Sequence, residues 1–331
     1  MKCNVPKTSV FVENVFGKYS LKPCCLPSTN LGYVDDIADI WNTEMQLDSD
    51  ICAACVVYGN KRRQQSFEDP TMTPGKLTHW DIRPGNTCNL KCVMCGPDNS
   101  SKWNEDIDIF NQFNEQKPKP TRSIDWEYIY KHSINKARLM YFAGGEPFYM
   151  KEVTQFLERL SEFEWNRKNT RIDFNTNGVS CTDKTIDILN RYDKVHMSIS
   201  IDGIGNVNEL IRYPTQWRVF REQLKILKKF DHHYNVTVSA LNLPVIDDLN
   251  IFCKGNMKLQ LLTFPEHLSI NCLKPDIVYE IYSLTQVDEL LPLLANYKYN
   301  SSMNEKMQDY LTALDSKRNT DSRSIIPWCF E

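Results

Sequence analysis

Short apolar runs alternate with amphipathic stretches through the middle of this chain. The predicted strands are residues 77–83, 138–143, 171–176, 195–201, 235–241 and 259–264, and the predicted helices between them include 152–164, 182–191 and 216–230. Such alternation is typical of right-handed βαβ units around a parallel sheet or barrel. The pattern therefore predicts an α/β fold whose six strands form a partial (β/α)6 barrel.

Polar residues occupy one face of two successive predicted strands. These residues are Arg171, Asp173, Asn175 and Asn177 on one strand, and His196, Ser198, Ser200 and Asp202 on the next. A parallel strand that is covered on both faces is normally apolar throughout. The polar faces therefore predict a solvated cavity that holds a polar ligand. The alternative is that these side chains satisfy one another inside a filled barrel.

The two ends of the chain differ from this central region. Residues 1–75 contain five of the 12 cysteines and one predicted helix at 35–45, and residues 69–75 have the composition of a linker. Residues 281–297 and 302–316 are predicted helices. We expect a small cysteine-rich module at 1–75, the barrel at 76–272 and a helical C-terminal extension at 273–331.

Composition limits the class of protein. A net charge of −3 gives no basic field of the kind that nucleic-acid binders use. No apolar run approaches the ~20 residues that span a bilayer, and the N-terminus has no apolar signal core. We therefore expect a cytoplasmic protein that binds neither membranes nor nucleic acid, in a compartment where thiols stay reduced.

Three cysteines with the spacing C-x-x-x-C-x-x-C follow the first predicted barrel strand. Cys88, Cys92 and Cys95 can converge on one iron–sulfur cluster, for which sulfur is the suitable ligand. Three thiolates leave one iron of a four-iron cube without a protein ligand, open to a substrate or cofactor. The alternative is a zinc site, which requires a fourth ligand, and the nearby His79 precedes the loop.

The second predicted strand ends in Gly144-Gly145-Glu146-Pro147. Two glycines allow a ligand to approach the backbone, and backbone carbonyls and the Glu146 carboxylate can accept hydrogen bonds from an ammonium group. By itself the motif is also typical of a tight turn.

The N-terminal cysteines form a third group. Cys52 and Cys55 supply two ligands, and Cys3 with Cys24 or Cys25 completes four. Four thiolates suit either zinc or a complete 4Fe–4S cluster, and spacing does not separate the two. Of the adjacent pair, Cys24 is the preferred ligand.

Residues 76–272 resemble the radical S-adenosylmethionine (SAM) superfamily. The motifs that carry the resemblance are Cys88 to Cys95, Gly144 to Pro147, Asn175 to Gly178, Ser200 to Gly203, Arg212 and Pro265. The resemblance implies a TIM-type partial barrel with a 4Fe–4S cluster on the three cysteines and SAM on the open iron. It also implies reductive cleavage of SAM to a 5′-deoxyadenosyl radical, which abstracts hydrogen from a substrate.

The same resemblance implies the cofactor-binding residues and leaves catalytic residues unassigned. Gly144, Gly145 and Glu146 would hold the SAM ammonium group and Arg212 its carboxylate, for which a guanidinium fork is suited. The remaining contacts would come from Ser200 to the ribose or carboxylate, Asn177 to the ribose and Met94 to the adenine.

Residues 1–75 resemble the twitch module, a short form of the SPASM auxiliary-cluster domain, although that module usually follows the barrel. The matching segments are 23–25, 37–42 and 52–55. The resemblance implies a second 4Fe–4S cluster on Cys3, Cys24, Cys52 and Cys55, which would transfer electrons or stiffen the active-site wall.

Auxiliary clusters of this type are common in enzymes that modify peptides. The resemblance to the twitch module therefore implies a peptide or protein side chain as the substrate, with a sugar, nucleotide or other small molecule as the alternative. The expected electron donor is a flavodoxin or ferredoxin. A non-catalytic zinc-binding interaction protein is the alternative of another class.

Overall fold

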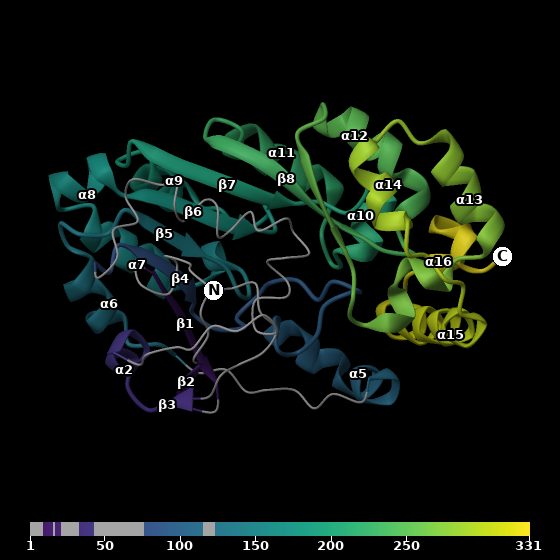
Figure 1. The fold of residues 1–331 in the computed structure, drawn as a ribbon, viewed down its shortest axis with the longest axis horizontal. Helices are drawn as coiled ribbons and strands as arrows, with labels where there is room; N and C mark the ends of the chain where they lie inside the picture. Colours follow the sequence, from purple (N-terminus) through teal and green to yellow (C-terminus); the bar gives the residue numbers. More distant parts are fainter. Residues whose placement is uncertain (1–8, 16, 21–32, 43–75, 115–122) are drawn as a thin grey trace. The chain divides into compact units, whose positions relative to one another are not determined.

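The computed structural model describes residues 9–15, 17–20, 33–42, 76–114 and 123–331. The chain divides into two units: the first comprises Met1–Thr87, Lys119–Thr176 and Ser180–Met197, and the second comprises Cys88–Pro118, Asn177–Val179 and Ser198–Glu331. The strand β7 (Lys194–Ser200) begins in the first unit and ends in the second. Figure 1 shows the elements of both.

The first unit is built on a sheet with a parallel core. Its strands lie in the order β3 (Tyr33–Val34), β2 (Lys18–Ser20), β1 (Ser9–Val15), β4 (His79–Arg83), β5 (Leu139–Phe142) and β6 (Arg171–Thr176). The strands from β1 to β6 in this order pair in parallel, with Val12 opposite Ile82 and Ile82 opposite Phe142, whereas β2 and β3 are antiparallel. This arrangement confirms the α/β class.

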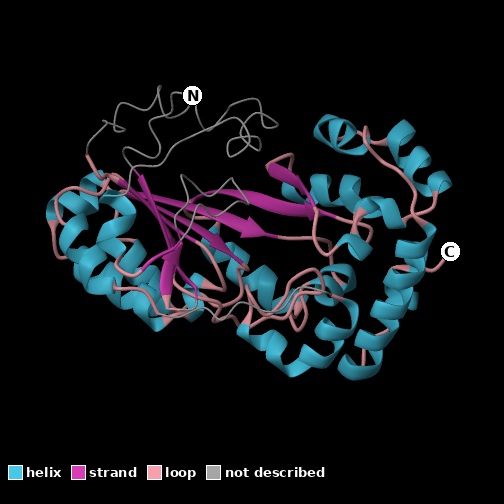
Figure 2. Ribbon diagram, turned by 60° about the horizontal axis from the view of Figure 1, so that its bottom comes forward, coloured by secondary structure: helices cyan, strands magenta, loops and turns pink. Residues whose placement is uncertain are grey.

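Apolar side chains cover one face of these strands. Phe142 and Phe174 are fully buried and stack with their ring centroids 5.4 Å apart. The helices of this unit are α2 (Ile37–Asn42), α6 (Trp126–Ser133), α7 (Lys151–Leu160), α8 (Glu164–Asn169) and α9 (Asp183–Leu189). Helix α7 contacts both α6 and α9 (Figure 1). Figure 2 distinguishes the helices from the strands by colour. It buries Val153, Phe156, Leu157 and Leu160, which follow the helical repeat.

In the second unit β8 (Asp231–Val238) and β9 (Met257–Leu261) pair in parallel. The helices are α5 (Ile107–Phe113), α10 (Asn206–Ile211), α11 (Trp217–Leu227), α12 (Ile246–Cys253), α13 (Pro275–Leu284), α14 (Leu291–Leu294), α15 (Ser301–Arg318) and α16 (Ser322–Ile325). Short 3₁₀ helices are η1 (Ser101–Asp106), η3 (Leu243–Val245), η4 (Glu266–Leu268), η5 (Ile270–Cys272), η6 (Asp288–Leu290) and η7 (Pro327–Cys329), and η2 (Pro147–Tyr149) belongs to the first unit.

All six predicted strands correspond to strands of the structure, β4 to β9. Strand β1 was not predicted, because Glu13 and Asn14 interrupt its apolar run. It lies within residues 1–75 and nevertheless pairs with β4 in the parallel part of the sheet. Part of that N-terminal region thus belongs to the same unit as the start of the predicted barrel.

The predicted helix at 281–297 is wrong. Helix α13 begins at Pro275 and ends at Leu284, and α14 covers only Leu291–Leu294. The break follows from a tertiary contact: Oδ1 of Asp247 accepts hydrogen bonds from the Thr285 hydroxyl (3.1 Å) and from the backbone N–H of Gln286 (2.8 Å). Local spacing cannot reveal such a partner.

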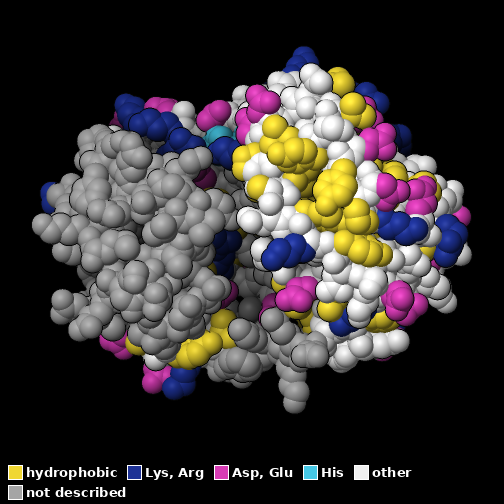
Figure 3. Space-filling model, turned by 45° about the vertical axis from the view of Figure 1, so that its right-hand side comes forward, with side chains coloured by type: hydrophobic (Ala, Val, Ile, Leu, Met, Phe, Trp, Pro, Cys, Tyr) yellow, Lys and Arg dark blue, Asp and Glu magenta, His cyan; other side chains and the backbone are white. Residues whose placement is uncertain are grey.

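Several large apolar side chains remain on the surface of the second unit, one face of which is drawn in Figure 3. The most exposed are Ile251 on α12 and Tyr279, Tyr282 and Leu284 on α13. No helix within the described ranges is long and apolar enough to cross a membrane.

His267 provides a pH-dependent contribution to the stability of the second unit. It is buried between the rings of Phe113 and Tyr310, with centroid distances of 6.2 and 4.6 Å, and its Nε2 has no hydrogen-bond partner among the described residues. Burial, and secondarily Lys306, lowers the pKa of His267 to about 4.

Because this pKa lies below the value of about 6.5 in the unfolded chain, the unfolded chain binds the proton more tightly. The contribution is complete above pH ~6.5 and is lost as the pH falls towards about 4, at a cost of up to about 3 kcal/mol. The free energy of unfolding, measured with urea across this pH range, should therefore change with pH more steeply in the wild type than in His267→Phe. Parallel slopes would contradict the assignment.

Candidate functional site

Two stretches that are distant in the sequence run side by side in the second unit. The backbone N–H of Lys91 donates to the carbonyl of Tyr213 (2.8 Å), and that of Val93 donates to the carbonyl of Ile211 (2.7 Å). The loop that carries Cys88, Cys92 and Cys95 (the triad loop, residues 88–95) therefore lies along residues 211–213. This pairing brings Arg212 beside Cys92.

Side-chain donors hold the carbonyl groups of the triad loop. Ser100 Oγ donates to the Leu90 carbonyl (2.5 Å), Trp103 Nε1 to that of Cys92 (3.0 Å) and the Tyr310 hydroxyl to that of Val93 (2.9 Å). All three donor residues are buried. A buried carbonyl without a donor costs about 1–3 kcal/mol, so these contacts define the path of the loop.

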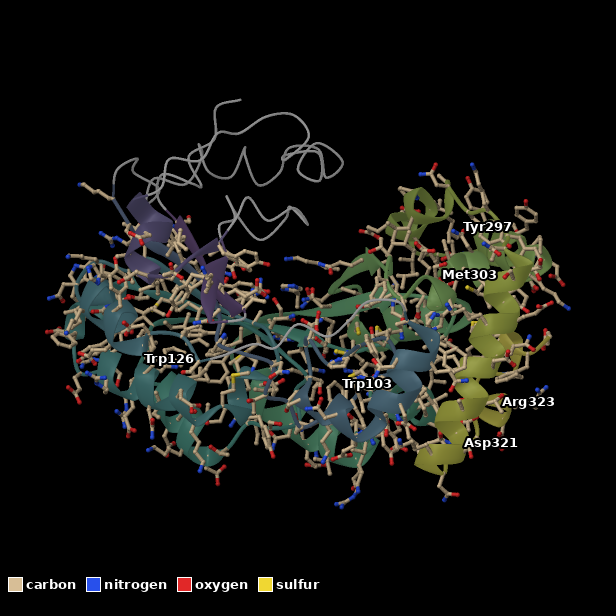
Figure 4. All side chains as sticks on the ribbon, turned by 90° about the horizontal axis from the view of Figure 1, so that it is seen from below. Trp103, Trp126, Tyr297, Met303, Asp321 and Arg323 are labelled. Carbon is tan, nitrogen blue, oxygen red and sulfur yellow. The ribbon has the colours of Figure 1, made fainter. Side chains whose placement is uncertain are left out.

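A buried carboxylate connects the triad loop to helix α15. Asp106 accepts from Lys91 Nζ at Oδ1 (2.9 Å) and from Arg318 Nε at Oδ2 (2.8 Å), and its side chain is 1% exposed. Lys91 also pairs with Glu105 (3.1 Å). Helices α5 and α15 lie side by side, and Trp103 lies in η1, just before α5 (Figure 4). The C-terminal segment thus has a structural role at the triad loop, which its sequence did not reveal.

The three triad cysteines form no disulfide within the described residues, and all three are half-buried. Burial raises the pKa of Cys92, against the effect of Arg212, and burial and the neighbouring charges of Cys92 and Cys88 raise that of Cys95. Three thiols that influence one another in this way repel as thiolates unless a cationic centre binds them. Their donor chemistry therefore fits an iron–sulfur cluster.

The described ranges contain no group of three or more Cys, His, Asp or Glu side chains that could hold a metal ion. All the ligands of a single metal ion surround one centre. The ligands of a four-iron cube bind separate irons, so their sulfurs are farther apart than the ligands of a single zinc.

Arg212 forms a buried ion pair with Asp202. Its Nη1 donates to Asp202 Oδ2 at 2.5 Å, while Asp202 Oδ1 accepts from the backbone N–H of Thr237 (2.8 Å). Burial opposes the charge of Arg212, but the negative groups around it, led by Cys92 and Asp202, raise its pKa overall. Its Nε is buried and has no hydrogen-bond partner among the described residues. One donor of the fork therefore remains for an anionic ligand.

The expected solvated face is not formed at every position. Asp202 is fully buried and satisfied by Arg212 and Thr237. Ser198, which is 7% exposed, shares a hydrogen bond with His233 Nε2 (3.2 Å). For these two residues the expectation of a solvated face is wrong, and the partners that satisfy them lie on other elements rather than on the two polar faces. The reason is the following strand and helix, which supply partners that the alternation of one strand cannot show.

In the first unit, the two glycines of the GGEP motif permit close backbone contact. Gly144 has φ +114°, and a Cβ on Gly145 would lie 2.2 Å from the Thr87 carbonyl oxygen. The backbone N–H of Gly145 donates to Gly85 (2.9 Å), and that of Glu146 donates to Thr87 (2.8 Å). The motif is thus required for packing against residues 85–87, whose chain leads directly into Cys88.

Glu146 is 1% exposed and binds protein groups. Its Oε1 accepts hydrogen bonds from the Thr176 hydroxyl (2.8 Å) and from the backbone N–H of Phe148 (3.1 Å). The carboxylate thereby caps η2 and joins it to the end of β6. The role of Glu146 towards an ammonium group stays a prediction.

Asn177 is tied to the triad loop. Its Nδ2 donates to Asn89 Oδ1 (2.8 Å) and lies 4.0 Å from Cys88 Sγ, and its Oδ1 accepts from the backbone N–H of Val179 (3.0 Å). Ser200, at the end of β7, and Met94 are half-buried. The predicted auxiliary-cluster ligands Cys3, Cys24, Cys52 and Cys55 lie outside the described residues.

The residues that sequence reasoning missed are those that hold the triad loop. Trp103, Asp106, Tyr310 and Arg318 form no motif and are scattered along the chain. The only signal is indirect: charged and aromatic residues occur within helices where they turn out to be buried.

Comparison with known proteins identifies the family. Residues 82–251, just over half of the chain, match the family model described as the radical SAM superfamily. The chain therefore belongs to the radical SAM superfamily.

Individual relatives are distant. An uncharacterized protein of Methanocaldococcus jannaschii is 23% identical over 250 residues, which are 72% of this chain and 79% of that protein. Among solved structures, anSMEcpe with bound AdoMet has 16% identity and a TM-score of 0.46, over 66% of this chain and 62% of its own. Streptococcus suis SuiB bound to S-adenosylmethionine has 14% identity and a TM-score of 0.41, and the match covers 85% of this chain and 57% of the SuiB chain. The chain thus spans less than two thirds of either solved chain.

Gly145→Ala tests the close approach at the GGEP motif. The new Cβ would overlap the Thr87 carbonyl oxygen, so the backbone must move, and we expect the free energy of unfolding to fall by about 1–3 kcal/mol. Gly205→Ala is the control, because a Cβ at Gly205 would have no atom within 4 Å and only the φ of +57° opposes alanine there. Chemical denaturation of both variants measures the difference. A smaller loss for Gly145→Ala than for Gly205→Ala would refute the packing role.

Tyr310→Phe tests the hydrogen bond from the Tyr310 hydroxyl on α15 to the Val93 carbonyl. The change leaves the Val93 carbonyl without the hydroxyl, so urea unfolding of the metal-free protein should show a loss of about 1–3 kcal/mol. Tyr282→Phe, at a tyrosine that is 51% exposed, should change the free energy by less than about 0.5 kcal/mol. Equal stabilities of the two variants would show that the hydroxyl does not support the loop.

Proposed function

We propose that this chain is a radical SAM enzyme that uses the triad loop to hold the cluster required for SAM cleavage. The observation that carries the proposal is the pairing of the triad loop with residues 211–213, which sets the Arg212 guanidinium beside Cys92. Thiolates for iron and a cation for a carboxylate are thus present in one unit.

Cys88, Cys92 and Cys95 would bind a 4Fe–4S cluster as thiolates, and one iron would remain for SAM. When bound, the cluster and SAM together supply reductive cleavage to methionine and a 5′-deoxyadenosyl radical, which takes a hydrogen atom from the substrate. The protein groups bind and orient these cofactors.

Arg212 would hold the SAM carboxylate. Asp202 occupies Nη1 and fixes the side chain, so the buried Nε has a defined direction and lacks a partner among the described residues. A carboxylate is the anion that the planar fork accepts best, and it would remove the cost of the unsatisfied donor. Asp202 is therefore a positioning residue in this proposal.

The other cofactor contacts follow from the superfamily resemblance and the local structure. Gly144, Gly145 and Glu146 would hold the ammonium group, and Asn177 and Ser200 would face the ribose. Met94, on the triad loop, would lie against the adenine. In support, the backbone N–H of Glu146 donates to the carbonyl of Thr87, the residue that precedes Cys88. The Asn177 side chain donates to Asn89 on the triad loop.

A second 4Fe–4S cluster on Cys3, Cys24, Cys52 and Cys55 is proposed from the sequence alone, as is a peptide or protein side chain as substrate. A small-molecule substrate is the alternative. The location would be the cytoplasm, where a low-potential flavodoxin or ferredoxin would supply the electron.

Cys92→Ala tests the central proposal. We expect the variant, purified and reconstituted without oxygen, to form no 5′-deoxyadenosine from SAM and dithionite, because two thiolates do not retain the cluster. Cys253→Ala, at a buried cysteine on α12, should retain the wild-type yield. Wild-type protein that carries no iron, or that forms no 5′-deoxyadenosine, would refute the function.

Iron and sulfide analysis separates one cluster from two. About eight of each per chain indicates two 4Fe–4S clusters, and about four indicates the triad cluster alone. Cys55→Ala should lower the content to about four, keep slow SAM cleavage and stop substrate turnover. Full turnover by that variant would remove the auxiliary cluster from the mechanism.

A further inference from the structure

Arg318, at the end of α15, is a buried cation with unused hydrogen-bond donors. Its side chain is 2% exposed, and its Nε donates to Asp106 Oδ2 at 2.8 Å. Neither Nη1 nor Nη2 has a hydrogen-bond partner among the described residues. Buried donors are nearly always satisfied, so two unfilled groups on one guanidinium require an explanation.

The guanidinium lies against the residues that hold the triad loop. Its Cζ is 4.8 Å from the centre of the Trp103 ring and 5.1 Å from that of Tyr213. Trp103 donates to the Cys92 carbonyl, and the Tyr213 carbonyl accepts from Lys91. The geometry therefore places Arg318 next to the cluster-binding segment.

Local charges are already balanced around Asp106. Arg318 and Lys91 share its carboxylate, and Lys91 has Glu105 as a second partner. The Nε contact accounts for the position of Arg318, but not for its Nη groups. What remains unfilled is the hydrogen-bonding capacity of two buried N–H groups beside Trp103 and Tyr213, the residues that contact the triad loop.

We propose that Nη1 and Nη2 of Arg318 donate hydrogen bonds to the cluster and thiolates held by the triad loop, and thereby raise the reduction potential of the cluster. This inference rests on the proposed function. Reduction adds negative charge to an assembly of three thiolates and an iron–sulfur core. Donors to its sulfurs stabilise the reduced form more than the oxidised form. A purely structural arginine, held by Asp106 and two rings, would leave the potential unchanged.

Arg318→Lys is the decisive variant. Lysine keeps the positive charge and can keep Asp106 as its partner, but it lacks the two Nη groups. Arg318→Gln removes the charge as well. The matched controls are Lys317→Arg and Lys317→Gln, because Lys317 is the preceding residue on α15 and pairs with the exposed Asp108.

The measurement is an EPR-monitored redox titration of anaerobically reconstituted full-length protein, with iron analysis and thermal unfolding of the metal-free forms. We expect a lower midpoint potential for Arg318→Lys than for wild type, a still lower one for Arg318→Gln, and wild-type values for both Lys317 variants. Weaker cluster loading by Arg318→Lys, at an unchanged unfolding temperature of the metal-free form, would also support the contact.

A wild-type potential in cluster-loaded Arg318→Lys overturns the inference. The inference is also overturned if Arg318→Lys loses its cluster and its metal-free form unfolds at a lower temperature than the metal-free wild type, because Arg318 is then a structural residue. In either case wild-type protein still cleaves SAM, and the proposed function stands. Wild-type protein without iron on the triad loop would instead refute both.

Discussion

The candidate site depends on satisfying the backbone of one irregular loop. A loop that presents three thiols to one ligand cannot pair its carbonyls in a helix or a sheet, and buried carbonyls need donors. Here Ser100, Trp103 and Tyr310 supply them, and the strand-like pairing with residues 211–213 supplies acceptors for two N–H groups. Asp106 then neutralises the cations that approach from both sides. The thiols are thus held by contacts that are independent of their sulfur chemistry.

The role of each ion pair in the second unit depends on how deeply the pair is buried. Asp202 and Asp106 are almost inaccessible to water, and each holds an arginine that retains donors unfilled by the described residues. Removing one partner from such a pair is strongly destabilising, because the other charge stays buried. Each pair therefore fixes the position of one guanidinium group, and some N–H donors of that group have no partner among the described residues. Exposed pairs such as Lys225 with Glu222 have no such role.

The sequence was sufficient for the elements whose signal is local. Alternation and apolar periodicity identified β4 to β9, and the ordered motifs identified the superfamily, because the spacing of Cys88, Cys92 and Cys95 is itself the signal. Features that depend on contacts with residues distant in the sequence could not be predicted. Strand β1 contains two polar residues that only its pairing with β4 explains, and α13 ends early because Asp247 captures Gln286. The partners of Asp202, and the supports from Tyr310 and Arg318, likewise exist only after tertiary folding.

The order of these parts along the polypeptide has a consequence for biosynthesis. The triad cysteines are made early, whereas Tyr310 and Arg318 follow more than 200 residues later. Until α15 has emerged from the ribosome and docked, the Val93 carbonyl and Asp106 lack their C-terminal partners. The hydrogen bonds that hold the triad loop are therefore completed only late in synthesis, after α15 has been made.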